Sequence, residues 1–366
     1  MKYAVKIACD VLYRPADPRY AENIRNFQGC PTIAVSNGGR IYMGWYSGGT
    51  KEPHMENYNL LIYSDDEGAT WSKPLIVIPS SKERCVHALD IQLWCDPMGR
   101  LHVFWVQNDT EPVPDIMPKA NPDQPLVAVD GYMFGDFRHS EWEIICDNPD
   151  ADEPVFSAPR CLDVGFLRCK PTVLKNGAWL NFNYDQIETR YGYSISTDNG
   201  ATYTRCYGAK KIFTMFDEGM AYQRNDGSVR LLARCRAGEL AETISYDDGL
   251  TWTEAKLSGI VSADTRFFIS RTPMGRILLV HNDCRTSRTN MTICLSEDDG
   301  ITWKYRKCID TRDDLSYPDA DFHNGYIYLT YDRERTGAKE ILFLRFTEED
   351  IMDKEKELAP VIVSKP

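Results

Sequence analysis

Short hydrophobic runs rich in β-branched and aromatic residues alternate along the whole chain with compact turn signals. Most of these turns place Asn or Asp beside Gly, and such a pair joins two antiparallel strands because it tolerates the positive φ that a tight hairpin needs. The turns recur 61, 78, 50, 48 and 50 residues apart, which indicates a structural repeat. Six copies are present: Asn37-Gly38-Gly39, Asp96-Pro97-Met98-Gly99, Asn176-Gly177, Asp226-Gly227, Met274-Gly275 and Asn324-Gly325.

A second motif, the Asp-box, follows the hairpin turn in four of the six units. Its form is Ser-x-Asp-x-Gly-x-Thr-aromatic. The Asp side chain can hydrogen-bond the backbone, Gly supplies a positive φ and the aromatic residue returns to the interior, so each copy predicts a rigid turn. A calcium loop would need a different spacing of acidic residues and a bidentate Glu. The four copies begin at Ser64, Ser196, Ser245 and Ser296.

Together the two motifs predict an all-β fold, a six-bladed β-propeller of four-stranded antiparallel blades that spans residues 1–366 as a single domain. The Pro-rich stretch Glu111–Pro125 lies inside the second repeat, so we interpret it as a long functional loop rather than a linker. The strands expected in the first blade are Thr32–Val35, Ile41–Tyr46, Leu60–Tyr63 and Leu75–Ile78.

The last blade is harder to complete from the sequence. Its stretch from Tyr317 to Phe346 contains three strands, and we expect the amino-terminal strand near Tyr3–Cys9 to supply the fourth and close the ring. A short helix is expected near residues 347–358.

Composition narrows the function classes. The chain is 43% hydrophobic and carries a net charge of −12 without any run of Lys or Arg, which argues against nucleic acid as a partner. No window has the apolar length of a membrane span, and the amino-terminal stretch lacks the apolar run of a secretion signal. Twelve cysteines in such a chain favour reduced thiols and a cytoplasmic protein. No zinc-type spacing of Cys and His is present, so we expect neither a metal nor another cofactor.

The predicted topology separates two ends of the molecule. The hairpins and Asp-boxes share one end, whereas the loops between strands 2 and 3 and the connections between blades share the other, the open end, where function concentrates. Arginines and carboxylates gather in the open-end loops, although solvated charges and salt bridges would account for about half of them. These residues are Glu52, His54, Glu56, His87, Asp90, Arg168, Lys170, Asp185, Asp217, Glu218, Arg234, Arg236, Arg285, Arg288, Tyr317, Arg333 and Arg335.

The Asp-boxes and several open-end residues resemble those of sialidases over nearly the full chain. The resemblance implies three arginines that hold a sugar carboxylate, a Tyr nucleophile with a Glu partner, and an acidic residue as general acid and base. A tyrosine suits such a substrate, because a carboxylate nucleophile would be repelled by the carboxylate on the anomeric carbon. Sialidases are therefore an exception to the two-carboxylate scheme of most glycosidases.

In the carboxy-terminal half the resemblance assigns roles to individual residues. Glu218, in Asp217-Glu218-Gly219-Met220, takes the place of the Glu partner, and Arg234 that of one arginine. The segment Asn282–Asn290 precedes an Asp-box, where another arginine is implied; Arg288 is the first choice and Arg285 the second. Tyr317, in Leu315-Ser316-Tyr317-Pro318-Asp319, corresponds to the nucleophile. Two structural explanations stay open: Tyr317 is only an aromatic residue packed at the start of a strand, and Glu218 and Arg234 form only a structural salt bridge.

The amino-terminal half departs from the family pattern. Sialidases begin with Phe/Tyr-Arg-Ile-Pro, whereas this chain has Phe27-Gln28-Gly29-Cys30-Pro31, so the first arginine is missing. Either Arg25 or Arg168 reaches in from a neighbouring loop, or the substrate lacks the sialic-acid carboxylate. The general acid is expected at Glu52, with Glu56 second and Asp90 as a further substrate-binding residue.

These residues support two hypotheses. The leading one is an exo-acting, retaining glycoside hydrolase that removes a terminal acidic sugar from small glycans. The alternative is a carbohydrate-binding propeller that has kept the pocket and lost the chemistry; a protein-interaction propeller would instead expose an apolar patch. The oligomeric state is left open.

Overall fold

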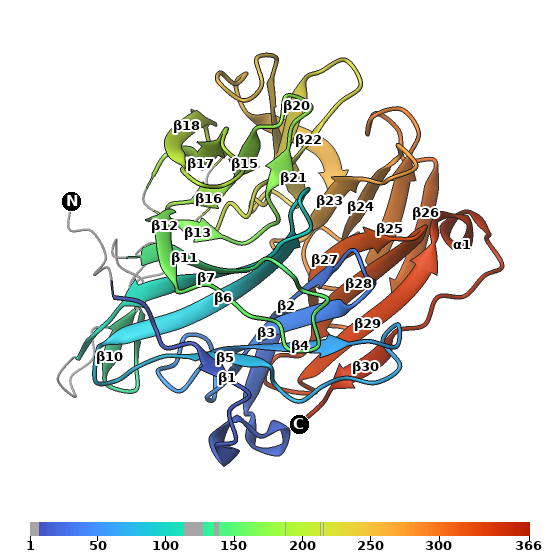
Figure 1. Ribbon diagram of the computed structural model, residues 1–366. Coiled ribbons are helices and arrows are strands. Elements are labelled where there is room, and N and C mark those ends of the chain that lie inside the picture. The colour runs from blue at the N-terminus through green and yellow to red at the C-terminus, as the bar shows by residue number, and fades with distance from the viewer. Residues whose placement is uncertain (1–6, 113–126, 135–138, 187, 213, 215) are drawn as a thin grey trace.

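The chain forms a ring of six antiparallel sheets, as the repeat predicts (Figure 1). The computed structural model describes all residues except 1–6, 113–126, 135–138, 187, 213 and 215. Within each blade the strands run in chain order from the inner to the outer edge. No helix in the described part of the chain is long and apolar enough to cross a membrane.

The blades in the first half of the ring carry additional short strands. Blade 1 contains β2 (Phe27–Val35), β3 (Ile41–Gly48), β4 (Tyr58–Ser64) and β5 (Ile76–Pro79), with β1 (Leu12–Tyr13) at its outer edge. Blade 2 contains β6 (Val86–Cys95), β7 (Leu101–Asp109), β11 (His139–Cys146) and β12 (Arg160–Val164). Blade 3 contains β14 (Thr172–Val173), β15 (Trp179–Asn181), β17 (Arg190–Ser196) and β18 (Thr204–Lys210), next to the pair β13 (Phe166–Leu167) and β16 (Asn183–Tyr184).

The second half of the ring is more regular. Blade 4 contains β19 (Met220–Gln223), β20 (Val229–Ala233), β21 (Glu239–Ser245) and β22 (Lys256–Val261). Blade 5 contains β23 (Phe268–Arg271), β24 (Ile277–Asn282), β25 (Met291–Ser296) and β26 (Tyr305–Asp310). Blade 6 contains β27 (Leu315–His323), β28 (Tyr326–Arg333), β29 (Glu340–Thr347) and β30 (Val361–Ser364).

The four Asp-boxes connect the third and fourth strands of blades 1, 3, 4 and 5, as predicted. In blade 3, Asp198 accepts hydrogen bonds from the backbone N–H and the hydroxyl of Thr202 at 2.8 and 2.6 Å, and the other three copies repeat this pattern. Hairpins lie at the same end: the N–H of Asn225 donates to Asp299 in the Asp-box of the next blade at 2.9 Å. The opposite end is thereby left to the long loops.

The ring closes differently from our expectation. The fourth strand of blade 6 is β30, which pairs with β29, so the prediction that the strand near Tyr3–Cys9 fills this place is wrong. Since β30 returns to blade 6 after the helix α1 (Glu348–Met352), that edge is already covered. The helix lies within the predicted range 347–358.

The loop between β7 and β11 of blade 2 contains a small sheet of β8 (Glu111–Pro112), β9 (Val127–Val129) and β10 (Tyr132–Phe134). Most of the stretch Glu111–Pro125, which we interpret as a functional loop, lies outside the described residues.

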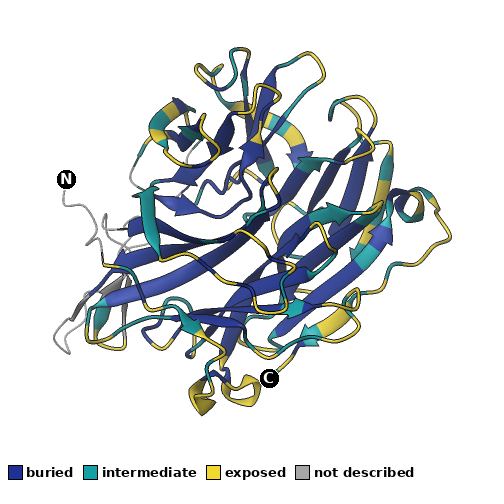
Figure 2. Ribbon diagram, viewed as in Figure 1, coloured by how far each residue is buried: buried dark blue, intermediate teal, exposed yellow. Residues whose placement is uncertain are grey.

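Burial decreases from the centre of the ring outward (Figure 2). Every residue of the innermost strand β2 is buried, whereas the outer strand β22 is mostly half-buried or exposed. Blades 1 and 6 meet through their innermost strands, where Asp319 accepts hydrogen bonds from the Thr32 hydroxyl at 2.7 Å and the Ile33 N–H at 3.0 Å. The buried Lys170 amine pairs with the same carboxylate at 3.1 Å. Polar side chains therefore fill the centre and hold the blades in one ring.

Candidate functional site

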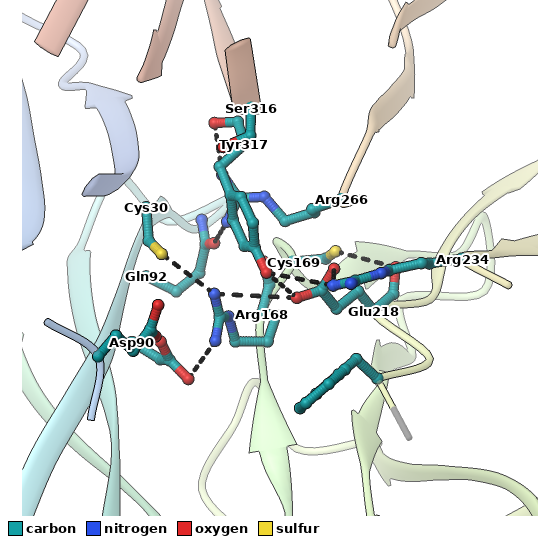
Figure 3. A network of polar contacts seen from close by, with 12 residues as sticks. Cys30, Asp90, Gln92, Arg168, Cys169, Glu218, Arg234, Arg266, Ser316 and Tyr317 are labelled. Carbon is teal, nitrogen blue, oxygen red and sulfur yellow. Dashed lines mark hydrogen bonds and ion pairs between the residues drawn. The ribbon is translucent and has the colours of Figure 1, made fainter. Parts of the chain in front are cut away.

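One residue in or just before the innermost strand of each blade contributes to a single cluster at the open end (Figure 3). Each of the six residues precedes the hairpin turn of its own blade by six to eight positions. Because the blades are related by rotation about the ring axis, equivalent positions meet at the centre. In blade order the residues are Cys30, Asp90, Arg168, Glu218, Arg266 and Tyr317.

Four of these residues have a positive φ angle, which residues other than glycine rarely adopt. The φ angles are 57° at Cys30, 58° at Asp90, 38° at Glu218 and 54° at Tyr317. In blades 1, 2 and 6 the pairing register also shifts at this point, as in a β-bulge. A bulge redirects a side chain at the cost of local strain, and such strain concentrates at functional sites.

Tyr317 and Glu218 form the centre of the cluster. The Tyr317 hydroxyl donates a hydrogen bond of 2.5 Å to Glu218 Oε1, although the two residues belong to blades 6 and 4. Arg234 Nη1 donates to the other carboxylate oxygen at 2.9 Å and to the Tyr317 hydroxyl at 3.3 Å. All three residues are at most 5% exposed. The pair is thus shielded from bulk water and held from both sides.

The surroundings set the protonation of this pair. Burial alone would raise the pKa of Glu218, but Arg234, Arg168 and the Tyr317 hydroxyl outweigh it and lower the pKa to about 2. Burial raises the pKa of Tyr317 well above its usual value, against the opposing charges of Arg168 and Arg234. In this arrangement the proton therefore stays on Tyr317 and points at an ionised acceptor.

Five arginines surround the Tyr317 ring. The guanidinium carbons of four of them lie 4.3 to 5.9 Å from the ring centroid, within cation–π range: Arg335 at 4.3 Å, Arg168 at 4.8 Å, Arg266 at 4.9 Å and Arg288 at 5.9 Å. The fifth, Arg234, contacts the hydroxyl. These cations would stabilise a tyrosine oxygen that loses its proton.

Carboxylates balance this positive charge. Asp90 pairs with Arg168, and Asp264 pairs with Arg234 at 2.6 Å. Arg335 pairs with Glu52 at 2.9 Å and with Asp332 at 3.1 Å. With Glu218, which pairs with Arg234 at 2.9 Å, five carboxylates pair with three of the five arginines, namely Arg168, Arg234 and Arg335.

The pKa of Asp90 is shifted in the opposite direction from that of Glu218. Burial raises its pKa to about 7; the nearby Arg168 opposes this shift, and the charges of Glu52 and Glu218 add to it. A carboxyl group with this pKa can gain or lose its proton near neutrality.

Cys30, Glu52 and Asp90 bring possible metal ligands within 4.8 Å of one another. The arrangement does not favour a cation, because Arg168 and Arg335 are already paired with the two carboxylates.

The structure brings most of the predicted site residues together: Tyr317, Glu218, Glu52, Arg234, Arg288, Arg168 and Asp90. Arg25, Arg285 and Glu56 lie elsewhere. Arg25 donates to Ser364 Oγ and the Tyr20 carbonyl behind blade 1, Arg285 pairs with Glu239, and Glu56 pairs with Lys82 in exposed loops. None of these three side chains makes a described contact with Tyr317.

Sequence reasoning missed Arg266 and undervalued Arg335. Arg266 donates hydrogen bonds to the carbonyls of Pro31, Arg168 and Tyr317 at 2.8 to 3.1 Å. It therefore connects blade 5 to blades 1, 3 and 6. Its position eight residues before the hairpin turn at Met274, similar to that of the equivalent residues in the other blades, could have identified it from the sequence. Arg335 follows no such rule, because it lies in a loop after β28.

Comparison with known proteins agrees with this geometry. The family described as BNR repeat-like domain matches residues 150–329, and the BNR/Asp-box repeat matches residues 62–73. No match is found among curated proteins. These matches identify BNR/Asp-box repeats in a chain that the structure shows to be a six-bladed β-propeller.

Solved structures give the fold more closely. The NanB sialidase of Streptococcus pneumoniae superposes with a TM-score of 0.70 at 16% identity, over 94% of this chain and 71% of that one. The intramolecular trans-sialidase of Ruminococcus gnavus gives 0.68 at 14% identity, over 94% and 98%. A protein of unknown function from Dyadobacter fermentans gives 0.63 at 18% identity, over 91% and 95%. The chain has the sialidase fold.

Proposed function

We propose that this protein is a sialidase-like, retaining glycoside hydrolase that removes a terminal acidic sugar from small glycans. The observation that carries the proposal is the hydrogen bond of 2.5 Å between the Tyr317 hydroxyl and Glu218 inside a ring of arginines. A buried tyrosine that is hydrogen-bonded to an ionised carboxylate is the arrangement expected of a nucleophile and its base.

In the proposed first step, the Tyr317 oxygen attacks the anomeric carbon while its proton passes to Glu218. The bond from the anomeric carbon to the leaving oxygen breaks, and Glu52, which must enter this step in its protonated form, gives that oxygen its proton and becomes a carboxylate. Because the raised pKa of Tyr317 and the lowered pKa of Glu218 oppose prior proton transfer, the proton must move as the new bond forms. The cluster of arginines supports the charge that develops on the phenolic oxygen.

In the second step, Glu52 takes a proton from water, and the resulting hydroxide attacks the anomeric carbon from the side that the leaving group left. The bond to the Tyr317 oxygen breaks, and Glu218 returns the proton. Two displacements at one carbon give net retention of configuration.

The experiment is incubation of the purified protein with aryl glycosides of acidic and neutral sugars, followed by NMR of the first sugar anomer released. Retention with an acidic sugar supports the proposal, whereas an inverted first product contradicts a tyrosine nucleophile. Saturable binding of these sugars without any cleavage would favour the alternative, a carbohydrate-binding propeller; the missing first arginine is the feature that favours this alternative.

A further inference from the structure

Arg335 occupies space that a side chain at residue 29 would otherwise fill. A Cβ added to Gly29 would lie 2.7 Å from both Cγ and Cδ of Arg335 and 2.8 Å from its Nε. Gly29 does not have a positive φ, so its backbone does not itself require glycine. The glycine is therefore explained by the arginine that packs over it.

Arg335 is also the arginine nearest to the Tyr317 ring. Its side chain comes from the loop after β28 and donates to Ser316 Oγ at 3.2 Å, next to the tyrosine. Together with Arg288 it lines a cavity of about 360 Å³. The two arginines thus border one open space, whose lining also includes Ser316, the neighbour of the proposed nucleophile, and the acidic residues Asp314 and Glu334.

The two carboxylate partners of Arg335 differ in how firmly they are held. Asp332 is fully buried and also accepts hydrogen bonds from the Cys30 N–H at 2.6 Å and from the Ser316 hydroxyl. The Glu52 side chain is 27% exposed, lies in a loop, and has Arg335 as its ion-pair partner. Asp332 therefore positions the arginine, whereas Glu52 can be displaced.

We propose that Arg335, with Arg288, binds the acidic group of the ligand in place of the arginine missing from blade 1, and that Glu52 occupies this place in the empty site. The inference rests on the proposed function and adds two features to it. The ligand's anion exchanges with the Glu52 carboxylate at Arg335, and the released Glu52 becomes free to carry the proton that the leaving group needs.

The test measures binding by calorimetry in the Tyr317→Phe background, so that no ligand is consumed. The probes are sialic acid, its methyl ester and, as a sugar-free anion, sulfate against chloride at equal ionic strength. Arg335→Met should lower the affinity for sialic acid by about tenfold to a hundredfold, as expected when a charge-assisted hydrogen bond is lost, and should leave the affinity for the methyl ester unchanged. Arg345→Met, which removes an arginine paired with Glu67 at the other end of the ring, is the matched control.

Two further variants keep the test decisive if Arg335→Met folds poorly. Glu52→Gln should raise the affinity for sialic acid and for sulfate by about twofold to fivefold, because it removes the ion pair that competes with the ligand for Arg335. Gly29→Ala should lower the affinity for both ligands, because the added methyl group displaces Arg335. The double variant Gly29→Arg with Arg335→Ala should recover part of the lost affinity, since it restores an arginine from blade 1.

The outcomes separate this inference from the proposed function. Unchanged anion binding in Arg335→Met, or unchanged or weaker binding in Glu52→Gln, would overturn the inference while leaving the nucleophile pair untouched. Absence of any anion binding in the parent protein would overturn it as well. If the protein binds sulfate in a manner that depends on Arg335 but does not bind sialic acid, the anion site is supported and sialic acid is excluded as the substrate.

Discussion

Replacing Tyr317 by phenylalanine removes one oxygen atom from the centre of the site and leaves the ring in place. If this oxygen is the nucleophile, hydrolysis should fall by at least about 10³-fold, because losing one member of a nucleophile and base unit costs about 10⁴ to 10⁶-fold in enzymes where this has been measured. Binding of the substrate should change little, since the arginines around the ring stay.

The structure also limits the effect on stability. The hydroxyl takes part in two hydrogen bonds, one to Glu218 and one from Arg234, and hydrogen bonds to charged groups contribute about 1.5 to 3 kcal/mol each. The two partners keep their direct contact of 2.9 Å in the variant, so neither charge is left alone. We therefore expect a net loss of about 1 to 3 kcal/mol, which a domain with a stability of about 5 to 15 kcal/mol tolerates.

Tyr331→Phe is the matched control. Tyr331 lies in the same blade, is fully buried, and its hydroxyl donates to Asp310 at 3.0 Å, away from the cluster. It should lose a similar amount of stability in urea unfolding and keep its full rate on an aryl glycoside. A loss of less than about tenfold in Tyr317→Phe, or equal losses of rate in both variants, would refute the nucleophile assignment.

Two further predictions concern pH. Burial raises the pKa of Asp90 to about 7, above the usual value of 3.8, so the folded protein holds this proton more tightly than the unfolded chain and loses stability as pH rises from about 4 to 7. Asp90→Asn, which imitates the protonated acid, should flatten this dependence by up to about 1.4 kcal/mol per pH unit in urea unfolding; an unchanged slope would contradict the raised pKa. Hydrogen bonds from the Thr202 hydroxyl, the Thr202 N–H and the Ser196 hydroxyl lower the pKa of Asp198 to about 2, so its contribution to stability exists above about pH 4 and disappears as pH falls toward 2. Asp198→Ala should therefore lower the melting temperature at neutral pH and not near pH 2, with hydrolysis unchanged; a loss of activity in the folded variant would place the Asp-box in the chemistry instead.

The sequence by itself was sufficient for the number of blades, although not for the strand that completes the last one. Hairpin turns and Asp-boxes are local motifs whose residues make their hydrogen bonds within a few positions, as Asp198 does with Thr202, so they can be recognised without knowing the fold. Their spacing implied six blades and therefore the end at which side chains converge. The pair Tyr317 and Glu218 could be predicted because the segments Asp217–Met220 and Leu315–Asp319 resemble the corresponding segments of sialidases.

Only the tertiary structure decided which charges meet. Arg25, Arg285 and Arg335 are all arginines in loops, and no motif in their local sequence says which of them reaches the site. The packing of blade 6 over Gly29 brings Arg335 to the tyrosine, while Arg25 turns toward Ser364 and Arg285 toward Glu239. The outer strand of blade 6 was likewise not decided by a local motif, because an edge strand can come from either end of a chain and pairing with β29 selected β30. Such choices depend on contacts between residues that lie tens to hundreds of positions apart, which no local pattern records.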